Sequence, residues 1–318
     1  MKRAPFAAIL LSSALLLGCS NEVEVSYDMQ TPFERELYSQ GDYSTLNAVG
    51  EVVGTGMRWW LTESYLPQGE GGVLARRYSG QKNMGYHRHS LPSELALKVP
   101  IRADVDARAM GAVRGYENFV ADVVEGLPVH SGFKTPLRDP ALVDRFVAEE
   151  RLRWKATHLL SGRVPRTGDL TASLRASLGE DLGLAPLRVD SVVARDYADL
   201  EIEGRKCFHY SIHYRLDDAP DADLLFEQFT KADTSDGRKF ADFKAAGASA
   251  KGDWRIWISP STGRLCREQD WQEITVVAAH RETGEALPVV ARKAVERLYT
   301  YDVEKQTKKH HKDALINQ

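Results

Sequence analysis

The sequence predicts an α+β protein in which helices of the N-terminal half pack on an antiparallel β-sheet formed by the C-terminal half. Two patterns indicate this division. Between residues 104 and 126, apolar side chains recur at three- and four-residue steps, which is typical of an amphipathic helix. In the second half, Phe208, Tyr210, Ile212 and Tyr214 share one face of an alternating segment, which is typical of a strand. Hydrophobic residues make up 43% of the chain and charged residues 27%, so a packed core is expected.

The first half, residues 31–186, is predicted to be a mixed region rich in helices. Thr31-Pro32-Phe33-Glu34 has the cap, the proline and the glutamate of a helix start, and Gly41 ends that short helix. Glycines with aromatic and β-branched residues indicate two or three strands between 46 and 101. Further helices are expected at 104–126, from Asp139-Pro140 to Ser161-Gly162, and at 169–178.

Residues 187–303 are predicted to form the antiparallel β-rich region. Strands are expected at 189–197, 200–214, 254–258 and 265–277, and Pro260 and Gly263 suit a turn between the last two. Residues 217–247 are expected to form a helical or irregular insertion. The segment that ends near Val303 is compatible with either a strand or a helix.

The N-terminus has the design of a secretory signal. Lys2 and Arg3 are followed by the apolar run from Ala7 to Leu17 and by Gly18-Cys19. The run is shorter than the roughly 20 residues that a transmembrane helix needs. It resembles the signal peptide and lipobox of bacterial lipoproteins, which implies that residues 1–18 are removed and that Cys19 carries lipid. An ordinary secretory signal is the alternative.

The resemblance also predicts where the protein lies. Residues 19–30 would be a polar tether between the lipid and a water-soluble body. In the lipoproteins that the chain resembles, an aspartate after the lipidated cysteine favours retention in the inner membrane. Ser20 stands at that position. We therefore expect an outer-membrane lipoprotein that faces the periplasm and contacts the membrane through Cys19, provided that the host is a Gram-negative bacterium.

The charge balance argues against a nucleic-acid partner. The precursor has 42 basic and 45 acidic residues, and loss of Lys2 and Arg3 leaves 40 basic residues, or a net charge of −5. Residues 304–318 include a short basic run and are expected to be a flexible polar tail.

Cys207 and Cys266 form an even pair once Cys19 is lipidated. In an oxidising compartment a disulfide between them is expected. It would close a loop of roughly 60 residues and contribute about 3–4 kcal/mol in the chain-entropy model.

One stretch of the second half is similar to a known family. Gly204-Arg205-Lys206-Cys207 and the run from Trp254 through Pro260 and Gly263 to Leu265 resemble paired strands of the envelope half-barrel proteins related to the Lol lipoprotein carriers. Ser259 stands where those proteins usually have an aspartate. The resemblance covers roughly residues 187–303 and implies a curved antiparallel sheet, a possible half-barrel, around an apolar cavity that holds acyl chains. The alternative is a generic sheet without a cavity.

No catalytic, cofactor or metal motif was identified. The chain has no G-x-S-x-G elbow, phosphate-binding glycine loop or H-E-x-x-H helix. His209 and His213 would lie about 13 Å apart on a regular strand, too far for one zinc ion. We therefore favour a non-catalytic lipoprotein that binds an acyl chain or another apolar lipid moiety and needs no cofactor. The alternatives are an envelope scaffold that binds a protein partner without a pocket, and a hydrolase whose titratable residues converge from both halves.

Overall fold

Strands dominate both halves of the chain. The computed structural model describes residues 21–46, 52–84, 100–126, 140–195, 201–202, 205–218 and 242–301. In these residues strands make up 60% and helices 16%. The predicted α+β class is therefore wrong, because residues 31–186 contribute long strands to the sheet instead of a layer of helices packed on it.

The described residues contain one antiparallel sheet of eleven strands. Its spatial order is β6 (Met110–Arg114), β5 (Ile101–Val105), β4 (Gly71–Met84), β3 (Val52–Gln68), β2 (Phe33–Leu46), β15 (Ala286–Thr300), β14 (Leu265–His280), β13 (Phe243–Ile258), β12 (Phe208–Leu216), β9 (Arg188–Arg195) and β8 (Gly168–Asp169). Two separate pairs flank it, β1 (Glu22–Val25) with β7 (Gly162–Pro165), and β10 (Glu201–Ile202) with β11 (Arg205–Lys206).

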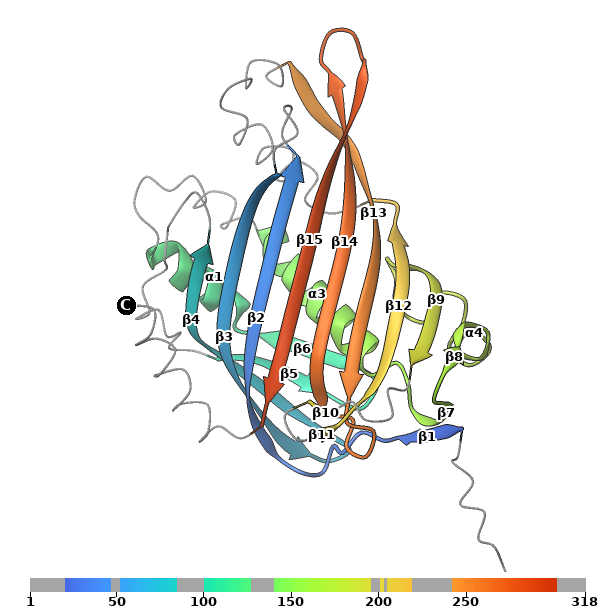
Figure 1. Ribbon diagram of the computed structural model, residues 1–318. Coiled ribbons are helices and arrows are strands. Elements are labelled where there is room, and N and C mark those ends of the chain that lie inside the picture. The colour runs from blue at the N-terminus through green and yellow to red at the C-terminus, as the bar shows by residue number, and fades with distance from the viewer. Residues whose placement is uncertain are drawn as a thin grey trace, which may run out of the picture.

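The two halves of the chain meet in the middle of the sheet. Strand β2 pairs with β15, with Leu37 opposite Tyr299, so the first and last long strands are neighbours. The sheet is curved, and α3 lies on its concave side, which we call the hollow (Figure 1). Residues distant in sequence therefore face one another across this hollow.

Strands form at each place in the second half where alternation predicted them, but with different bounds. The predicted strand 200–214 is divided among β10, β11 and β12, and β13 begins at Phe243, inside the predicted insertion 217–247, which is therefore wrong over 243–247. Phe208, Tyr210, Ile212 and Tyr214 are all buried on the inner face of β12. The turn between β13 and β14 is closed by a hydrogen bond from the Gly263 N–H to the Ser259 carbonyl, 2.7 Å. The last segment, left open between helix and strand, is β15. Of the predicted insertion, residues 219–241 lie outside the described part.

The helix predicted from Thr31 is wrong. Phe33, Arg35 and Leu37 share the inner face of β2, so the period of the segment is two. The backbone N–H of Thr31 donates to the carboxylate of Asp28, 3.0 Å, in a turn that precedes the strand. Residues 31–34 thus match the capping-box pattern although no helix follows them.

The helix predicted over 104–126 is correct only in its last part. Strands β5 and β6 form a hairpin there, in which Asp104 pairs with Arg114, 2.8 Å, and the carboxylate of Asp106 accepts the N–H of Ala109, 2.7 Å. Gly115, with φ +95°, then connects β6 to α1 (Tyr116–Gly126). Short strands with some helical spacing were mistaken for one helix.

The other two predicted helices are present, as α3 (Pro140–Thr157) and α4 (Thr171–Leu178). Helix α3 crosses the hollow of the sheet (Figure 1). Near its N-terminal end Phe146 stacks on Tyr116 of α1, with ring centroids 5.7 Å apart. Near its C-terminal end the Ala156 carbonyl accepts a hydrogen bond from Tyr210 of β12, 2.8 Å. Both sides of the hollow therefore contact α3.

Part of the predicted tether, residues 19–30, belongs to the folded body. Val25 in β1 is 1% exposed, and the Tyr27 hydroxyl donates to the Leu160 carbonyl, 2.8 Å. Residues 1–20 and 302–318, with the predicted signal, Cys19 and the polar tail, lie outside the described part.

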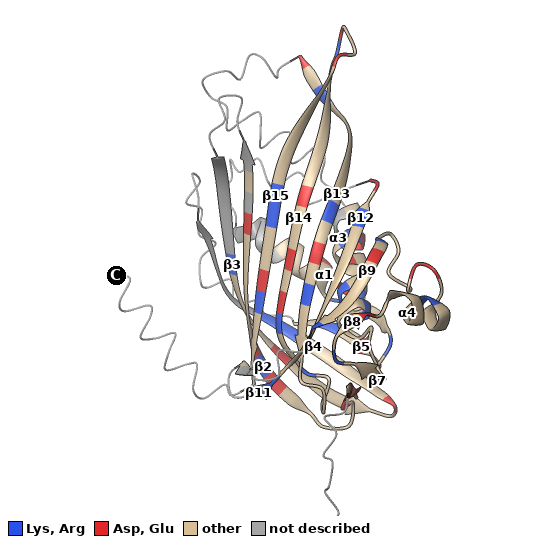
Figure 2. Ribbon diagram, turned by 45° about the vertical axis from the view of Figure 1, so that its right-hand side comes forward, with Lys and Arg blue, Asp and Glu red and all other residues tan. Residues whose placement is uncertain are grey.

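The outer face of the sheet carries charges of both signs. Figure 2 shows them as mixed bands across β12–β15. Glu273, for example, pairs with Lys251 at 2.7 Å and lies 3.9 Å from Arg292. Opposite charges on neighbouring strands are typical of a sheet face that is exposed to solvent.

Candidate functional site

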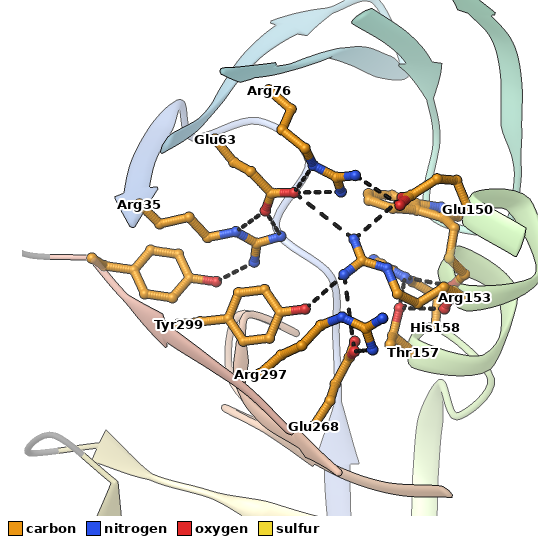
Figure 3. A network of polar contacts seen from close by, with 12 residues as sticks. Arg35, Glu63, Arg76, Glu150, Arg153, Thr157, His158, Glu268, Arg297 and Tyr299 are labelled. Atoms are coloured by element: carbon orange, nitrogen blue, oxygen red, sulfur yellow. Dashed lines mark hydrogen bonds and ion pairs between the residues drawn. The ribbon is translucent and has the colours of Figure 1, made fainter. Parts of the chain in front are cut away.

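Seven charged side chains meet in the hollow, where α3 packs on the sheet (Figure 3). Five come from strands of both halves and two from α3, and hydrogen bonds or ion pairs connect all of them. We call this set the ion network: Arg35 (β2), Glu63 (β3), Arg76 (β4), Glu150 and Arg153 (α3), Glu268 (β14) and Arg297 (β15).

Glu63 is the centre of the network. Its side chain is 0% exposed. Arg35 donates from Nε to Oε2 at 2.7 Å, and Arg76 donates from Nε and Nη2 to Oε1 at 2.8 and 2.6 Å. A third guanidinium, that of Arg153, lies 3.8 Å from Oε1. Charge-assisted bonds of this geometry are the arrangement in which a carboxylate is tolerated in a protein interior.

The network connects α3 to both sides of the hollow. On one side, Nη1 of Arg76 in β4 donates to Oε1 of Glu150 at 2.7 Å. On the other, Nη1 of Arg153 donates to the hydroxyl of Tyr299 in β15 at 2.9 Å and lies 3.9 Å from Oε2 of Glu268 in β14. The helix is thus attached to β4, β14 and β15 by polar contacts.

The electrostatics keep the carboxylates of Glu63 and Glu150 ionised at neutral pH. Burial alone would raise the pKa of Glu63, but Arg35, Arg76 and Arg153 outweigh it and hold that pKa well below its usual value. Burial also opposes the shift of Glu150, whose pKa is nevertheless lowered to about 2, by Arg153 and Arg76. A general acid or base needs a pKa near the working pH, and the pKa values of Glu63 and Glu150 lie far below neutral pH.

A hydrolase would also need an activated nucleophile. Beside the network, the Thr157 hydroxyl lies 3.1 Å from Nδ1 of His158, but it is buried and donates to the Arg153 carbonyl at 2.9 Å. Burial lowers the pKa of His158 to about 3. In the described ranges no group of three or more His, Cys, Asp or Glu could hold a metal ion. Titratable residues from both halves do converge in the ion network, as the hydrolase alternative required. Their contacts join α3 to the sheet.

A second polar group lies on the inner face nearer the β14–β15 hairpin. Tyr214 of β12 lies across Gly252 of β13, where an added Cβ would come within 2.3 Å of the tyrosine ring. The Tyr214 hydroxyl therefore reaches β14. It donates to Oδ1 of Asp270 at 2.7 Å and accepts from Nε2 of Gln272 at 2.7 Å. Burial raises the pKa of Asp270. We call Tyr214, Asp270 and Gln272 the tyrosine cluster.

Beyond the tyrosine cluster the inner face is apolar. Strands β13, β14 and β15 continue well past α3 toward the hairpin (Figure 1). Seven of their inward side chains there are small or β-branched and at most 6% exposed, whereas Leu287, opposite Ala278 near the end of β15, is 42% exposed. We call these seven the apolar wall: Ala248, Ala250, Ile274, Val276, Ala278, Val289 and Ala291. The resemblance to half-barrel carriers implied an apolar cavity within residues 187–303. Beside β2, β3 and β4, which lie outside that range, the inner face carries the ion network.

Of the site residues predicted from the sequence, Cys19 lies outside the described part. Cys207 and Cys266 are both buried and belong to one small cluster with Trp257. Their disulfide stays a prediction, which mass spectrometry of the intact chain after thiol labelling tests.

None of the ion network was predicted from the sequence, although a signal exists. Glu63 stands between Leu61 and Tyr65, where the alternation of β3 calls for an apolar residue. Arg35 occupies the same kind of position in β2, as does Arg76 in β4. Charged residues in the apolar phase of several strands indicate a buried network, but only after the strands have been recognised.

Comparison with known proteins gives little further evidence. No family model and no curated protein matches the chain. Among solved structures, one described as lipid-protein interactions in lipovitellin matches with a TM-score of 0.41 and 11% identity. The match covers 86% of this chain and 26% of the other, so the chain spans about a quarter of that protein's length. Within the described residues, no helix is both long and apolar enough to cross a membrane.

Proposed function

We propose that the protein is a lipid-anchored lipoprotein of the bacterial envelope that binds an apolar ligand, an acyl chain or other lipid moiety, along the apolar wall. The wall is the observation that carries this proposal. It is a continuous set of apolar side chains on three long strands, buried in the folded chain and bounded by the polar groups of the tyrosine cluster. Binding sites for amphipathic ligands commonly combine such a surface with a few polar groups.

The size of the wall side chains supports an extended apolar ligand. Ala248, Ala250, Ala278 and Ala291 are short, so a chain laid along the strands could approach the backbone closely. Each methylene that the chain buries contributes about 0.8 kcal/mol. The ion network complements the wall, because it fixes α3 in the other part of the hollow.

The anchor supports the location. We propose that Cys19 is acylated and that the chain belongs to the outer membrane and faces the periplasm. Cys19 precedes β1, which starts at Glu22, by only three residues. The β14–β15 hairpin lies at the opposite end of the sheet from β1 (Figure 1). The wall would therefore open away from the membrane that holds the anchor.

Uptake of a fluorescent acyl probe tests the binding function. The full chain, purified in detergent and stripped of lipid, should bind the probe with saturation. Ala250→Trp places a large side chain on the wall and should abolish uptake, and Ala250→Leu should weaken it. Ala294→Trp, on the exposed outer face of β15, is the matched control and should bind like the parent. Thermal melts show which variants are folded. Absence of uptake by the parent, or uptake that folded Ala250 variants leave unchanged, would contradict the proposal.

Mass spectrometry tests the anchor separately. The chain isolated from its host should begin at Cys19 and carry acyl groups there. An unprocessed, unmodified N-terminus would refute acylation, whatever the result of the binding assay.

A further inference from the structure

Two buried polar atoms on the inner face of the sheet have no hydrogen-bond partner among the described residues. They are Nε1 of Trp254 and Oε1 of Glu268. Trp254 is 6% exposed and Glu268 is 0% exposed. The other carboxylate oxygen of Glu268 accepts from Arg297 at 3.1 Å. Leaving a buried polar group unsatisfied costs about 1–3 kcal/mol, so both atoms require an explanation.

The two side chains are neighbours. Trp254 in β13 pairs directly with Asp270 in β14, and Ile256 pairs with Glu268. Trp254 and Glu268 are therefore diagonal neighbours on the same face of the sheet, a separation that aromatic and long side chains span. Asp270 lies opposite Trp254 and two residues from Glu268 along β14, so both side chains border the tyrosine cluster, to which Asp270 belongs.

The chemistry of the two atoms is complementary. The indole N–H of Trp254 can only donate, and an ionised carboxylate oxygen of Glu268 can only accept. One hydroxyl group satisfies both, because its oxygen accepts from the indole while its hydrogen is donated to Oε1. A carboxylate could accept from the indole but has no hydrogen for Glu268. An ether or ester oxygen has the same deficiency.

We infer that Trp254 and Glu268 form a subsite for a hydroxyl group at the polar end of the bound amphiphile. This inference rests on the proposed function and specifies the ligand class: an uncharged acyl or alkyl lipid whose head carries a free hydroxyl. The chain lies on the apolar wall, and the hydroxyl lies at its boundary with the tyrosine cluster. Fatty-acid anions and capped heads of the same chain length bind more weakly.

A long-chain alcohol and its methyl ether isolate the hydroxyl hydrogen. Calorimetry with the full, delipidated chain should show that the alcohol binds about tenfold more tightly than the ether, the size of one hydrogen bond to a charged group. Trp254→Phe keeps the aromatic packing and removes the N–H, from which the oxygens of both ligands accept, so it should weaken binding of the alcohol and of the ether alike. Trp271 is 41% exposed on the outer face, and Trp271→Phe is the control that should bind both ligands like the parent.

NMR supplies a second readout. The indole N–H signal that disappears in Trp254→Phe should shift on addition of the alcohol. Equal affinity of the alcohol and the ether, with no shift of this signal, would mean that the two atoms hold a trapped water only and would overturn the inference while leaving the proposed function intact. If neither ligand binds, the proposed function fails and the subsite with it.

Discussion

Replacing Glu63 with glutamine tests whether the ion network holds α3 in the hollow. The substitution preserves the shape of the side chain and removes its charge. The carboxylate now faces Arg35 at 2.6 Å and Arg76 at 2.6 Å, and all three side chains are nearly inaccessible to water. In Glu63→Gln one acceptor oxygen is replaced by an NH₂ group. This group is a hydrogen-bond donor and faces the N–H donors of a guanidinium group, so no hydrogen bond can form there. The arginines remain buried without their counter-charge.

The expected cost is large. Removing one partner of a buried ion pair destabilises a protein by about 3–5 kcal/mol, because a charge is left uncompensated. Total stabilities are only about 5–15 kcal/mol, so this loss is a large fraction of the whole. At roughly 2–4 °C per kcal/mol, the melting temperature should fall by about 10 °C.

Urea unfolding of the full chain measures this cost, with Glu273→Gln as the matched control. Glu273 is also on a strand and pairs with Lys251 at 2.7 Å, but on the outer face, where such a pair contributes about 0–1 kcal/mol. Hydrogen exchange should show that the α3 amides, residues 140–157, exchange faster in Glu63→Gln alone. If the two variants lose equal stability and α3 is equally protected in both, the network does not hold the helix.

Two further predictions concern His158, which follows α3, and Gly252 of β13. The folded pKa of His158, about 3, lies below its ordinary value of 6.5, so the unfolded chain binds more protons between those values and stability should fall as the pH drops from 6.5 toward 3. Acid titration of the melting temperature checks this, and His158→Phe should flatten part of the slope. Gly252→Ala should destabilise the chain by about 1–3 kcal/mol through its clash with Tyr214, whereas Gly111→Ala, whose Cβ meets nothing closer than 3.5 Å, should be nearly neutral in calorimetry.

The sequence predicted strands best where apolar residues kept a strict period of two. In β12, Phe208, Tyr210 and Ile212 left no alternative. In β2 the inward positions include Arg35 and Gly41, which interrupt the apolar phase, and a capping-like tetrapeptide at 31–34 favoured a helix. The β-character of the first half was therefore obscured by the residues that build the site. The two halves are joined by the pairing of β2 with β15, which are more than 200 residues apart in the sequence. A pattern of neighbouring residues cannot predict this pairing.

The same reasoning explains why the ion network was not predicted. Glu63 and Glu268 are separated by most of the chain, and both contact α3 only after the sheet has curved around it. Glu150 follows Glu149 in the sequence, and the arginine of β4 that pairs with it, Arg76, is 74 residues away in the chain. The alternation within one strand shows that a charged residue points inward. Its ion-pair partner comes from a segment that is distant in the sequence, so it becomes known only from the folded structure.

The composition of the lipid that accompanies the protein shows whether the apolar wall binds lipid in the cell. The chain and its Ala250→Trp variant would be isolated from host envelopes, and noncovalently bound lipid would be extracted and identified by mass spectrometry. We expect about one acyl lipid per chain in the parent, with a free hydroxyl in its head, and little in the folded variant. Equal or negligible lipid in both would contradict the claim that the apolar wall is a binding surface.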